Sequence, residues 1–484
     1  MQVKRPVIGK YILDSLSIGM YNHPLMLLRE YIQNSADAID AYKRSNPPPE
    51  YHPKIDINIG GNSRIMRIRD NGSGIPFNRA QNVLHDLGNS SKKLNESRGF
   101  RGIGRLGGLG YCDKLAFSTK YEGEDISSTS VWDCRKIRQL MKIENHYDTQ
   151  DILSTIIDFQ QNKYEGDVLD HYFEVEMSDL SGSRDILLDV PLIKSYVSEV
   201  APVPFNKKVF SFADEVDQKL RSKVKGYETY RITVNGEQIF KPYTDKLLLR
   251  GDHKDFVKGI EYLELSSNEN SLAIGWMAKT KLLGTLSSQS HLDGLRVRKD
   301  NILVGDKNLL NEFYRESRFN NYLVGEIYAI AEHLVPNSRR DDFEDNACKD
   351  DFYESFIKAI GLPVSKTIRH NSVERSKERV RAKDLKIIEQ AEQILERGYL
   401  TESQKLTILR KLVRLKDCDY GGNGNLDELI QGIRGSIHHL DTKMANGYKK
   451  YRNLIKPVFE ILYQEHDDKD KAVRIINRIL DSWT

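Results

Sequence analysis

The helix predicted over residues 27–40 constrains the fold more than any other segment, because two periodic patterns run along it. One set of positions recurs at helical intervals and predicts a face packed against a core: Leu28, Ile32, Ser35 and Ile39. Glu30, Asn34 and Asp37 recur at i, i+4 and i+7 on another face. The segment therefore predicts a helix with one buried side and a row of two carboxylates and one amide on another.

This polar row has the composition of a site for a hard cation and a water molecule. The Asn34 amide offers Mg²⁺ a neutral oxygen, while phosphates and water would fill the rest of its octahedral shell. Glu30, one turn earlier, is placed to orient or deprotonate an attacking water. Taken alone, the row has a simpler interpretation, because acidic and amide side chains also form the solvated side of ordinary surface helices.

A second segment, residues 65–76, predicts a strand that ends in a glycine turn. Residues 55–69 carry the two-residue alternation of paired strands, and Asp70 falls where the chain leaves the sheet. Gly72 and Gly74 let the backbone approach a flat ligand closely, so that Asp70 can accept a hydrogen bond from an exocyclic amine. The alternative is an ordinary hairpin, since Asn-Gly is a common turn.

A third segment, residues 98–110, is rich in glycine and places Gly102, Gly104 and Gly107 in a GxGxxG spacing. It is not a dinucleotide fingerprint, because no apolar strand precedes it, and no Gly-Lys-Ser/Thr makes it a Walker loop. Any phosphate must therefore be held by glycine N–H groups, the following helix end and nearby cations. The polar stretch 89–98 has the composition of a lid that closes over a nucleotide.

In this order and spacing, the three segments resemble the ATP-binding motifs of the GHKL superfamily, which comprises gyrase, the ninety-kilodalton heat-shock chaperone, histidine kinases and MutL. The resemblance implies a Bergerat-type α/β sandwich that binds ATP and Mg²⁺. It implies Glu30 as general base, Asn34 as the Mg²⁺ ligand and Asp70 as the adenine contact, and it makes Lys92 or Lys93 a lid cation. The remaining nucleotide contacts that it implies are Asp37, Gly72, Gly74, Gly102, Gly104, Gly107, Gly108 and Gly110.

Residues 322–341 resemble the middle domain of the heat-shock chaperone. In that family an apolar strand leads into a Pro-x-Asn-x-Ser-Arg-like loop whose arginine reaches the ATP γ-phosphate. Arg339 holds the matching place, with Arg340 as the neighbouring alternative. Such a guanidinium neutralises transition-state charge and reports the nucleotide state together. Two alternatives stay open: Lys299 as the lysine that gyrase-like and MORC-like members use, and a surface salt-bridge cluster at residues 339–342.

One family element is missing from the sequence. A Gly-Thr pair that contacts ATP precedes a sheet strand in the family, whereas Asp170 and His171 precede the matching strand at residues 172–177 here. This leaves either a different nucleotide contact or an insertion. The insert at residues 121–167 is also longer than a minimal ATPase core needs, and the sequence assigns no function to it.

Length and composition predict a multidomain cytoplasmic protein. The 484 residues exceed a single core and predict about three domains. The formal charge of only +3 does not by itself demand nucleic acid or a membrane. The four cysteines are far apart with no CxxC pair, which argues against a zinc site and fits reduced thiols. Neither a signal peptide nor a membrane span is expected.

The predicted fold class is α+β in several parts. We expect an ATP-binding domain at residues 1–190, a connector at 191–225, a middle (transducer) α/β domain at 226–362 and a charged helical C-terminal region at 363–484. The middle domain is expected to begin with a strand at 230–234 and to contain a helix at 311–318. Basic and acidic residues alternate in the tail, which favours a solvated helix face over a nucleic-acid arm.

Three functions remain in play. The first is a slowly hydrolysing, chaperone-like ATPase that acts as a nucleotide-gated switch on a protein partner and forms a homodimer when ATP binds. The second is a MORC- or MutL-like clamp that closes on duplex DNA, with binding that falls steeply with salt. The third is a nucleotide-dependent scaffold without turnover. Glu30 argues against the third, since a pure sensor needs no carboxylate one turn before the Mg²⁺ ligand.

Overall fold

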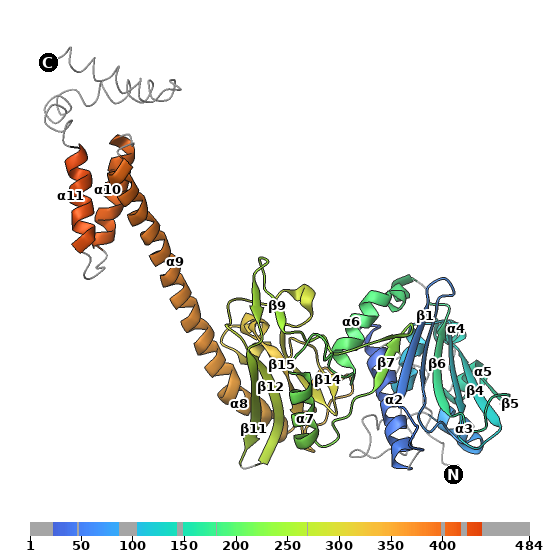
Figure 1. Cartoon of the computed structure of the whole chain (residues 1–484). Helices are drawn as coiled ribbons and strands as arrows, with labels where there is room; N and C mark the ends of the chain where they lie inside the picture. The colour runs from blue at the N-terminus through green and yellow to red at the C-terminus, as the bar shows by residue number, and fades with distance from the viewer. Residues whose placement is uncertain are drawn as a thin grey trace, which may run out of the picture. The chain divides into compact units, whose positions relative to one another are not determined.

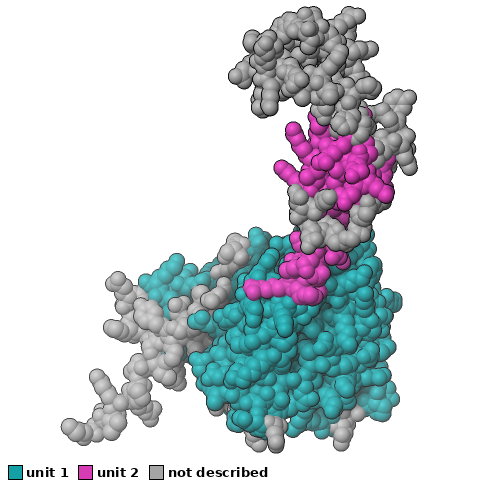
Figure 2. All heavy atoms as spheres, turned by 90° about the vertical axis from the view of Figure 1, so that its left-hand side faces the viewer, with its two compact units in different colours: residues 1–368 teal, residues 369–484 magenta. Residues whose placement is uncertain are grey.

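The computed structural model describes residues 23–45, 48–86, 104–142, 149–180, 182–268, 270–397, 402–417 and 424–437. The chain divides into two compact units, residues 1–368 and residues 369–484 (Figure 2). The first unit holds the β-sheets, and the described part of the second is helical. The predicted α+β class is therefore confirmed, with an α/β N-terminal domain and a helical C-terminal region (Figure 1).

The first sheet has eight strands in the order β5-β4-β3-β6-β2-β1-β7-β8 (Figure 1). Its strands are β1 (Lys54–Gly60), β2 (Ile65–Asp70), β3 (Lys114–Lys120), β4 (Ile126–Asp133), β5 (Ile157–Lys163), β6 (Tyr172–Ser178), β7 (Arg231–Val234) and β8 (Glu237–Gln238). Strands β1 and β7 pair in parallel, and the other neighbours pair antiparallel. The insert at 121–167 thus supplies β4 and β5, which extend the sheet at one edge.

One face of this sheet is apolar and packs against helices. In β2 the alternation places Met66 and Ile68 in the core, and Arg67 and Arg69 on the opposite face. The helices are α2 (Met26–Arg44), α3 (Phe77–His85), α4 (Cys134–Lys142), α5 (Thr149–Ile156) and α6 (Val190–Val200), with the 3₁₀ helices η1 (Gly104–Gly110) and η2 (Gly182–Leu188). The apolar face predicted for α2 is confirmed, since its four positions are at most 4% exposed: Leu28, Ile32, Ser35 and Ile39.

A second sheet of five strands follows, in the order β11-β12-β15-β13-β14. Its strands are β11 (Gly259–Ser267), β12 (Asn270–Lys279), β13 (Gly294–Lys299), β14 (Ile302–Val304) and β15 (Val324–Ala329), next to a two-stranded sheet of β9 (Lys246–Leu248) and β10 (Lys254–Phe256). The helical segments here are α7 (Ala213–Lys223), η3 (Ser288–Ser290), η4 (Asn311–Phe313), η5 (Ser317–Tyr322), α8 (Ala347–Phe356) and the π-helical turn η6 (Ile357–Gly361).

Two expectations for this region are wrong. The strand at 230–234 does not begin the second domain, because β7 pairs with β1 in the first sheet. Residues 311–318 do not form an α-helix, because they fall into η4 and η5. In this segment Phe313 N donates to Leu310 O, three residues earlier, and Arg315 N donates to the Ser365 hydroxyl at 3.2 Å. Both bonds differ from the bond to the fourth preceding residue that builds an α-helix.

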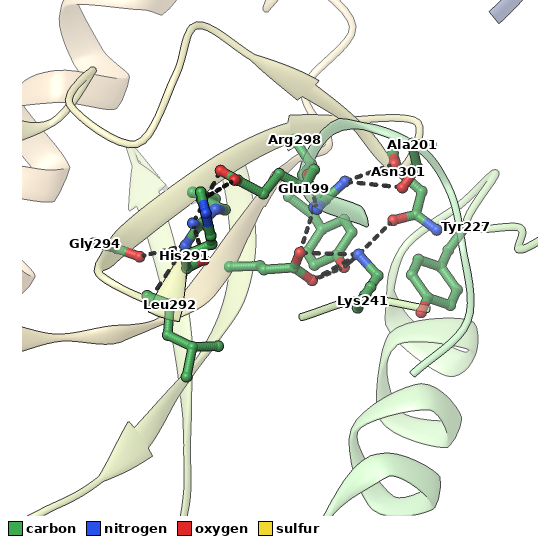
Figure 3. A network of polar contacts seen from close by, with 12 residues as sticks. Glu199, Ala201, Tyr227, Lys241, His291, Leu292, Gly294, Arg298 and Asn301 are labelled. Atoms are coloured by element: carbon green, nitrogen blue, oxygen red, sulfur yellow. Dashed lines mark hydrogen bonds and ion pairs between the residues drawn. The ribbon is translucent and has the colours of Figure 1, made fainter. Parts of the chain in front are cut away.

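A buried ionic cluster lies where the second sheet meets the end of α6 (Figure 3). Glu326 of β15 is fully buried and forms ion pairs with Arg298 of β13 and with Lys241, whose Nζ lies 2.9 Å from Glu326 Oε1. Arg298 Nη2 also donates to Glu199 O at 2.6 Å, at the end of α6. Burial alone would raise the pKa of Glu326, but Arg298 and Lys241 hold it at about 2. Glu326 is therefore a carboxylate that the cluster keeps charged.

The second unit contains its own small core. Helix α9 (Leu362–Arg397) begins within the first unit, and α10 (Glu402–Asp417) and α11 (Gly424–Ile437) follow it. The buried residues of this core are Ala391, Leu412, Leu426, Leu429, Ile430 and Ile433. No helix in the described ranges combines the length and the apolar character needed to cross a lipid bilayer.

Candidate functional site

Helix α2 carries the polar row that the sequence predicts. Glu30 is 9% exposed and Asp37 is 6% exposed, while Asn34 is half-buried. The ordinary solvated side of a surface helix would leave such side chains in water. The burial of two carboxylates on one helix is instead typical of groups held in place for chemistry or for a structural ion pair.

The glycine turn after β2 packs directly on α2. The Asp70 carboxylate is 2% exposed, and its Oδ1 accepts a hydrogen bond from Gly72 N at 2.9 Å. A side chain at Gly72 would place its Cβ 2.6 Å from the backbone carbon of Ala38 in α2. Gly74 has a φ of +64°, which favours glycine, and a Cβ there would collide with the backbone. The turn therefore needs both glycines to bring Asp70 to the helix.

The glycine loop η1 begins at the Glu30 carboxylate. A Cβ at Gly104 would lie 2.9 Å from Glu30 Oε2, so the loop backbone and this carboxylate are neighbours. Gly107 and Gly108 are buried, and Gly110 is half-buried. The predicted lid at 89–98 lies outside the described residues. So do the predicted contacts Lys92, Lys93 and Gly102.

Tyr31 joins the helix to this loop. Its hydroxyl donates to Arg105 O at 3.0 Å and accepts from Gly108 N at 3.0 Å. On the other side of Gly108, the Cys112 thiol donates to Gly108 O at 3.3 Å. Neither Tyr31 nor Cys112 had a predicted role in the site, because Tyr31 belongs to neither periodic pattern of the helix and Cys112 lies outside the three segments.

An arginine of the loop after β15 reaches the opposite side of Glu30. Arg340 Nε lies 3.3 Å from Glu30 Oε1, and Arg340 is 8% exposed with a φ of +55°. Arg29, next to Glu30, donates to Arg339 O at 2.8 Å and to Arg340 O at 3.3 Å. Burial lowers the pKa of Arg340, and the nearby Glu30 carboxylate opposes part of that shift.

The three basic residues that the sequence offered for the γ-phosphate contact have different surroundings. The guanidinium at Glu30 belongs to Arg340, whereas the side chain of Arg339, the favoured residue, is exposed. Lys299 Nζ instead donates to Ala331 O at 2.8 Å. Arg340 has a left-handed backbone conformation, and its side chain is buried where that of Arg339 is exposed, a difference that a motif match does not predict.

The Gly-Thr element is missing, and other residues contact the glycine turn. His171 Nδ1 lies 2.6 Å from Gly72 O, and the His171 ring packs on Tyr42 of α2 with centroids 4.1 Å apart. Thr119 of β3 is buried, and its hydroxyl accepts from Ile75 N at 2.9 Å. No local motif marks Thr119 as a neighbour of the turn. Arg29 was detectable only as the neighbour of Glu30.

The side chains around α2 fit Mg²⁺ only together with a nucleotide. In the part of the chain that the structure describes, no three His, Cys, Asp or Glu side chains gather closely enough to hold a metal ion. The half-buried Asn34 amide can give one neutral oxygen, which suits a cation whose other ligands are phosphates and water.

A family match covers helix α2, the glycine turn and the glycine loop, and several known proteins are similar to part of the chain. Residues 23–162 match the family described as Histidine kinase-, DNA gyrase B-, and HSP90-like ATPase. The chain is 28% identical over 142 residues to chaperone protein HtpG of Buchnera aphidicola, which is 26% of this chain and 23% of that protein. It is 27% identical over 183 residues to HtpG of Rickettsia canadensis, which is 34% of this chain and 29% of that protein. The matches thus span less than a third of the length of these curated relatives.

Proposed function

We propose that this chain, whose N-terminal domain is a GHKL-type ATPase domain similar to that of the HtpG chaperones, binds ATP and hydrolyses it slowly as a conformational switch. One observation carries the proposal. The Glu30 carboxylate lies between Gly104 of the glycine loop and the guanidinium of Arg340. The carboxylate that we propose as base, the loop that we propose to hold phosphate and a cation are thus neighbours on α2, and this arrangement supports phosphoryl transfer to water.

Three predicted residues and the glycine loop have roles in this scheme. Glu30 accepts a proton from the attacking water, and Asp70 accepts a hydrogen bond from the adenine amine. Backbone N–H groups of η1 hold the phosphates. Mg²⁺, bound with the nucleotide and with Asn34 as its protein ligand, supplies charge neutralisation at the phosphates.

The contact of Arg340 with Glu30 supports a gated reaction. While the guanidinium neutralises Glu30, it is not on a phosphate, and the carboxylate is held by a cation. We assign the γ-phosphate contact to Arg340 rather than Arg339, because the Arg340 side chain is the buried one. Transfer of Arg340 from Glu30 to the γ-phosphate would free the base and change the loop after β15 together. Movement of this loop, with ATP-dependent pairing of two chains, is how we expect the switch to act on a protein partner.

ATP turnover by the purified chain tests this function. Glu30→Ala should still bind ATP but turn over at least about 10²-fold more slowly, since it loses general-base catalysis. Glu176→Ala, on the opposite face of the sheet, is the matched control and should behave as the parent. If Glu30→Ala hydrolyses ATP at the parental rate, the assignment of the base is wrong.

The same assay separates the alternatives when it is repeated with duplex DNA at low and physiological salt. Slow turnover that depends on Glu30 and ignores DNA supports a protein-directed switch. Stimulation by DNA that fades with salt would support the clamp. Tight ATP binding without turnover would leave the scaffold.

A further inference from the structure

We infer that Tyr31 is a positioning residue for the nucleotide reaction, which holds the glycine loop η1 in the shape that accepts phosphate. The inference rests on the proposed function and adds a residue to it. Tyr31 belongs neither to the polar row nor to the apolar face that the sequence predicts for α2, yet it is 2% exposed beside Glu30. A buried phenol with a hydrogen-bonding hydroxyl between two loop residues is more than a packing group.

The hydroxyl ties two points of the loop together. It donates to Arg105 O and accepts from Gly108 N, both at 3.0 Å. A hydroxyl has one donor and spare acceptor capacity, so both bonds form at once. Removing the oxygen leaves a buried N–H and a carbonyl to find other partners, which favours other loop conformations.

This geometry also divides the glycines of the loop by role. The Gly108 N–H is directed at Tyr31, and the Gly108 carbonyl accepts from the Cys112 thiol. Gly108 is therefore an anchor rather than a phosphate donor, and phosphate is held by N–H groups nearer Gly104, where the Glu30 carboxylate lies. The close packing explains the absence of a side chain, since a Cβ at Gly108 would lie 2.5 Å from the Tyr31 hydroxyl oxygen and 2.9 Å from Leu115.

If the loop is less ordered, fewer molecules have the shape that binds the nucleotide. The apparent affinity for the nucleotide then falls by the same factor as the fraction of binding-competent molecules. Once a nucleotide has ordered the loop, however, Glu30 and Arg340 act as they do in the parent. Loss of the hydroxyl should therefore raise KM and leave kcat nearly unchanged. A general loss of structure would instead lower both the stability and kcat.

Tyr31→Phe tests this, with Tyr230→Phe as the matched control. Tyr230 is equally buried, and its hydroxyl donates to Asp40 at the far end of α2 at 2.6 Å. We expect Tyr31→Phe to raise KM for ATP, and Kd for a non-hydrolysable ATP analogue, about tenfold, with kcat within about threefold of the parent. A Kd within about twofold of that of Tyr230→Phe would overturn the inference.

Gly108→Ala in both backgrounds tests the contact itself. In the parent, the added methyl meets the Tyr31 oxygen, and we expect Kd to rise more than about tenfold. In Tyr31→Phe that oxygen is gone and only the flexible end of Leu115 must shift. Gly108→Ala should therefore raise Kd less than about threefold in this background. Equal factors in both backgrounds would overturn the inference. Absence of turnover in the parent would refute the proposed ATPase, but the Kd values of the variants would still test the role of Tyr31. A parent that binds no analogue would overturn both the proposed function and this inference.

Discussion

At the scale of single residues, the pair Glu30 and Arg340 decides how the site is regulated. The guanidinium both restrains the proposed base, 3.3 Å away, and is the cation available for the γ-phosphate. Removing it should free the base, which raises turnover, and remove the cation from the γ-phosphate, which lowers turnover. Charge neutralisation of a transferring phosphoryl group usually has the larger effect on rate, so turnover should fall.

Arg340→Ala should accordingly lower ATP turnover by about 10²-fold, with a change in ATP affinity of less than about threefold. Arg339→Ala is the control on the same loop, and its exposed side chain should be dispensable. Steady-state turnover and calorimetric binding of both variants check this. The opposite ranking of the two variants would return the role to Arg339.

Asp70→Asn should abolish measurable nucleotide binding. The amide keeps an oxygen for Gly72 N, so the turn survives, but adenine loses a charged acceptor in a buried site. Loss of such a bond weakens binding by about 10²-fold, and an unmatched amide donor adds to this. Asp56→Asn, on the outer face of β1, is the control, and calorimetry with ATP and ADP is the measurement. Parental affinity in Asp70→Asn would show that adenine is held elsewhere.

The sequence indicated candidate site residues that belong to motifs, and it did not indicate neighbours whose partners are distant. Asp70 and the glycines became candidates because each sits in a short pattern with a physical purpose. Thr119 bonds Ile75 across 44 residues, and Tyr31 reaches Gly108 across 77, so no local pattern marks them. The sequence also does not predict which of Arg339 and Arg340 is buried, because neighbouring residue types do not fix the backbone angle found at Arg340.

At the scale of elements, the contact between α6, β13 and β15 depends on the buried ionic cluster around Glu326 (Figure 3). Breaking such a cluster on one side leaves charges without compensation, which costs far more than losing an exposed pair. Burial and the neighbouring Arg298 already lower the pKa of Lys241 to about 7, with Glu326 opposing them. The Glu326 carboxylate thus offsets the cost of burying the positive charges of Lys241 and Arg298.

Glu326→Gln should lower the free energy of unfolding by about 3–5 kcal/mol. Glu176→Gln, which loses only its exposed pair with Arg67, should change it by less than about 1 kcal/mol. Because the folded-state pKa of Glu326 is depressed, its contribution is present above about pH 4.5 and is lost as pH falls towards 2. Urea titrations of parent and variant across this range should converge at low pH. A constant difference would argue against the charge as the cause.

Sequence patterns predicted those helices and strands well in which regularly spaced apolar residues form one buried face. Strands β1 and β2 and helix α2 follow such patterns. The expectations failed at 230–234, where the strand was recognised but its partner sheet was not. They also failed at 311–318, where backbone N–H groups bond a carbonyl three residues earlier or the distant Ser365 hydroxyl. Which distant strands pair is decided by the tertiary structure, and the spacing of apolar residues along one strand does not predict it.

At the scale of the whole molecule, the described cores divide between the two units. The three larger cores lie within residues 25–368, and the small core of α9, α10 and α11 lies beyond them. A fragment that ends at residue 379, about three helical turns past Ile368, therefore keeps every group of the proposed site.

This fragment should unfold cooperatively and bind an ATP analogue within about twofold of the affinity of the full chain. Thermal unfolding followed by circular dichroism, and calorimetric titration, test it. An insoluble fragment, or one with much weaker binding, would show that the second unit contributes to the fold or to the site.

The parallel pairing of β7 with β1 has a consequence for synthesis on the ribosome. Strand β1 presents an open edge from the time it emerges until Arg231 and its neighbours arrive to pair with Lys54 and the residues after it. At ordinary translation rates this wait is on the order of ten to thirty seconds. The nascent chain is then most exposed to wrong strand pairing, so slower elongation between these two strands should lower the soluble yield, while slower elongation after β8 should not.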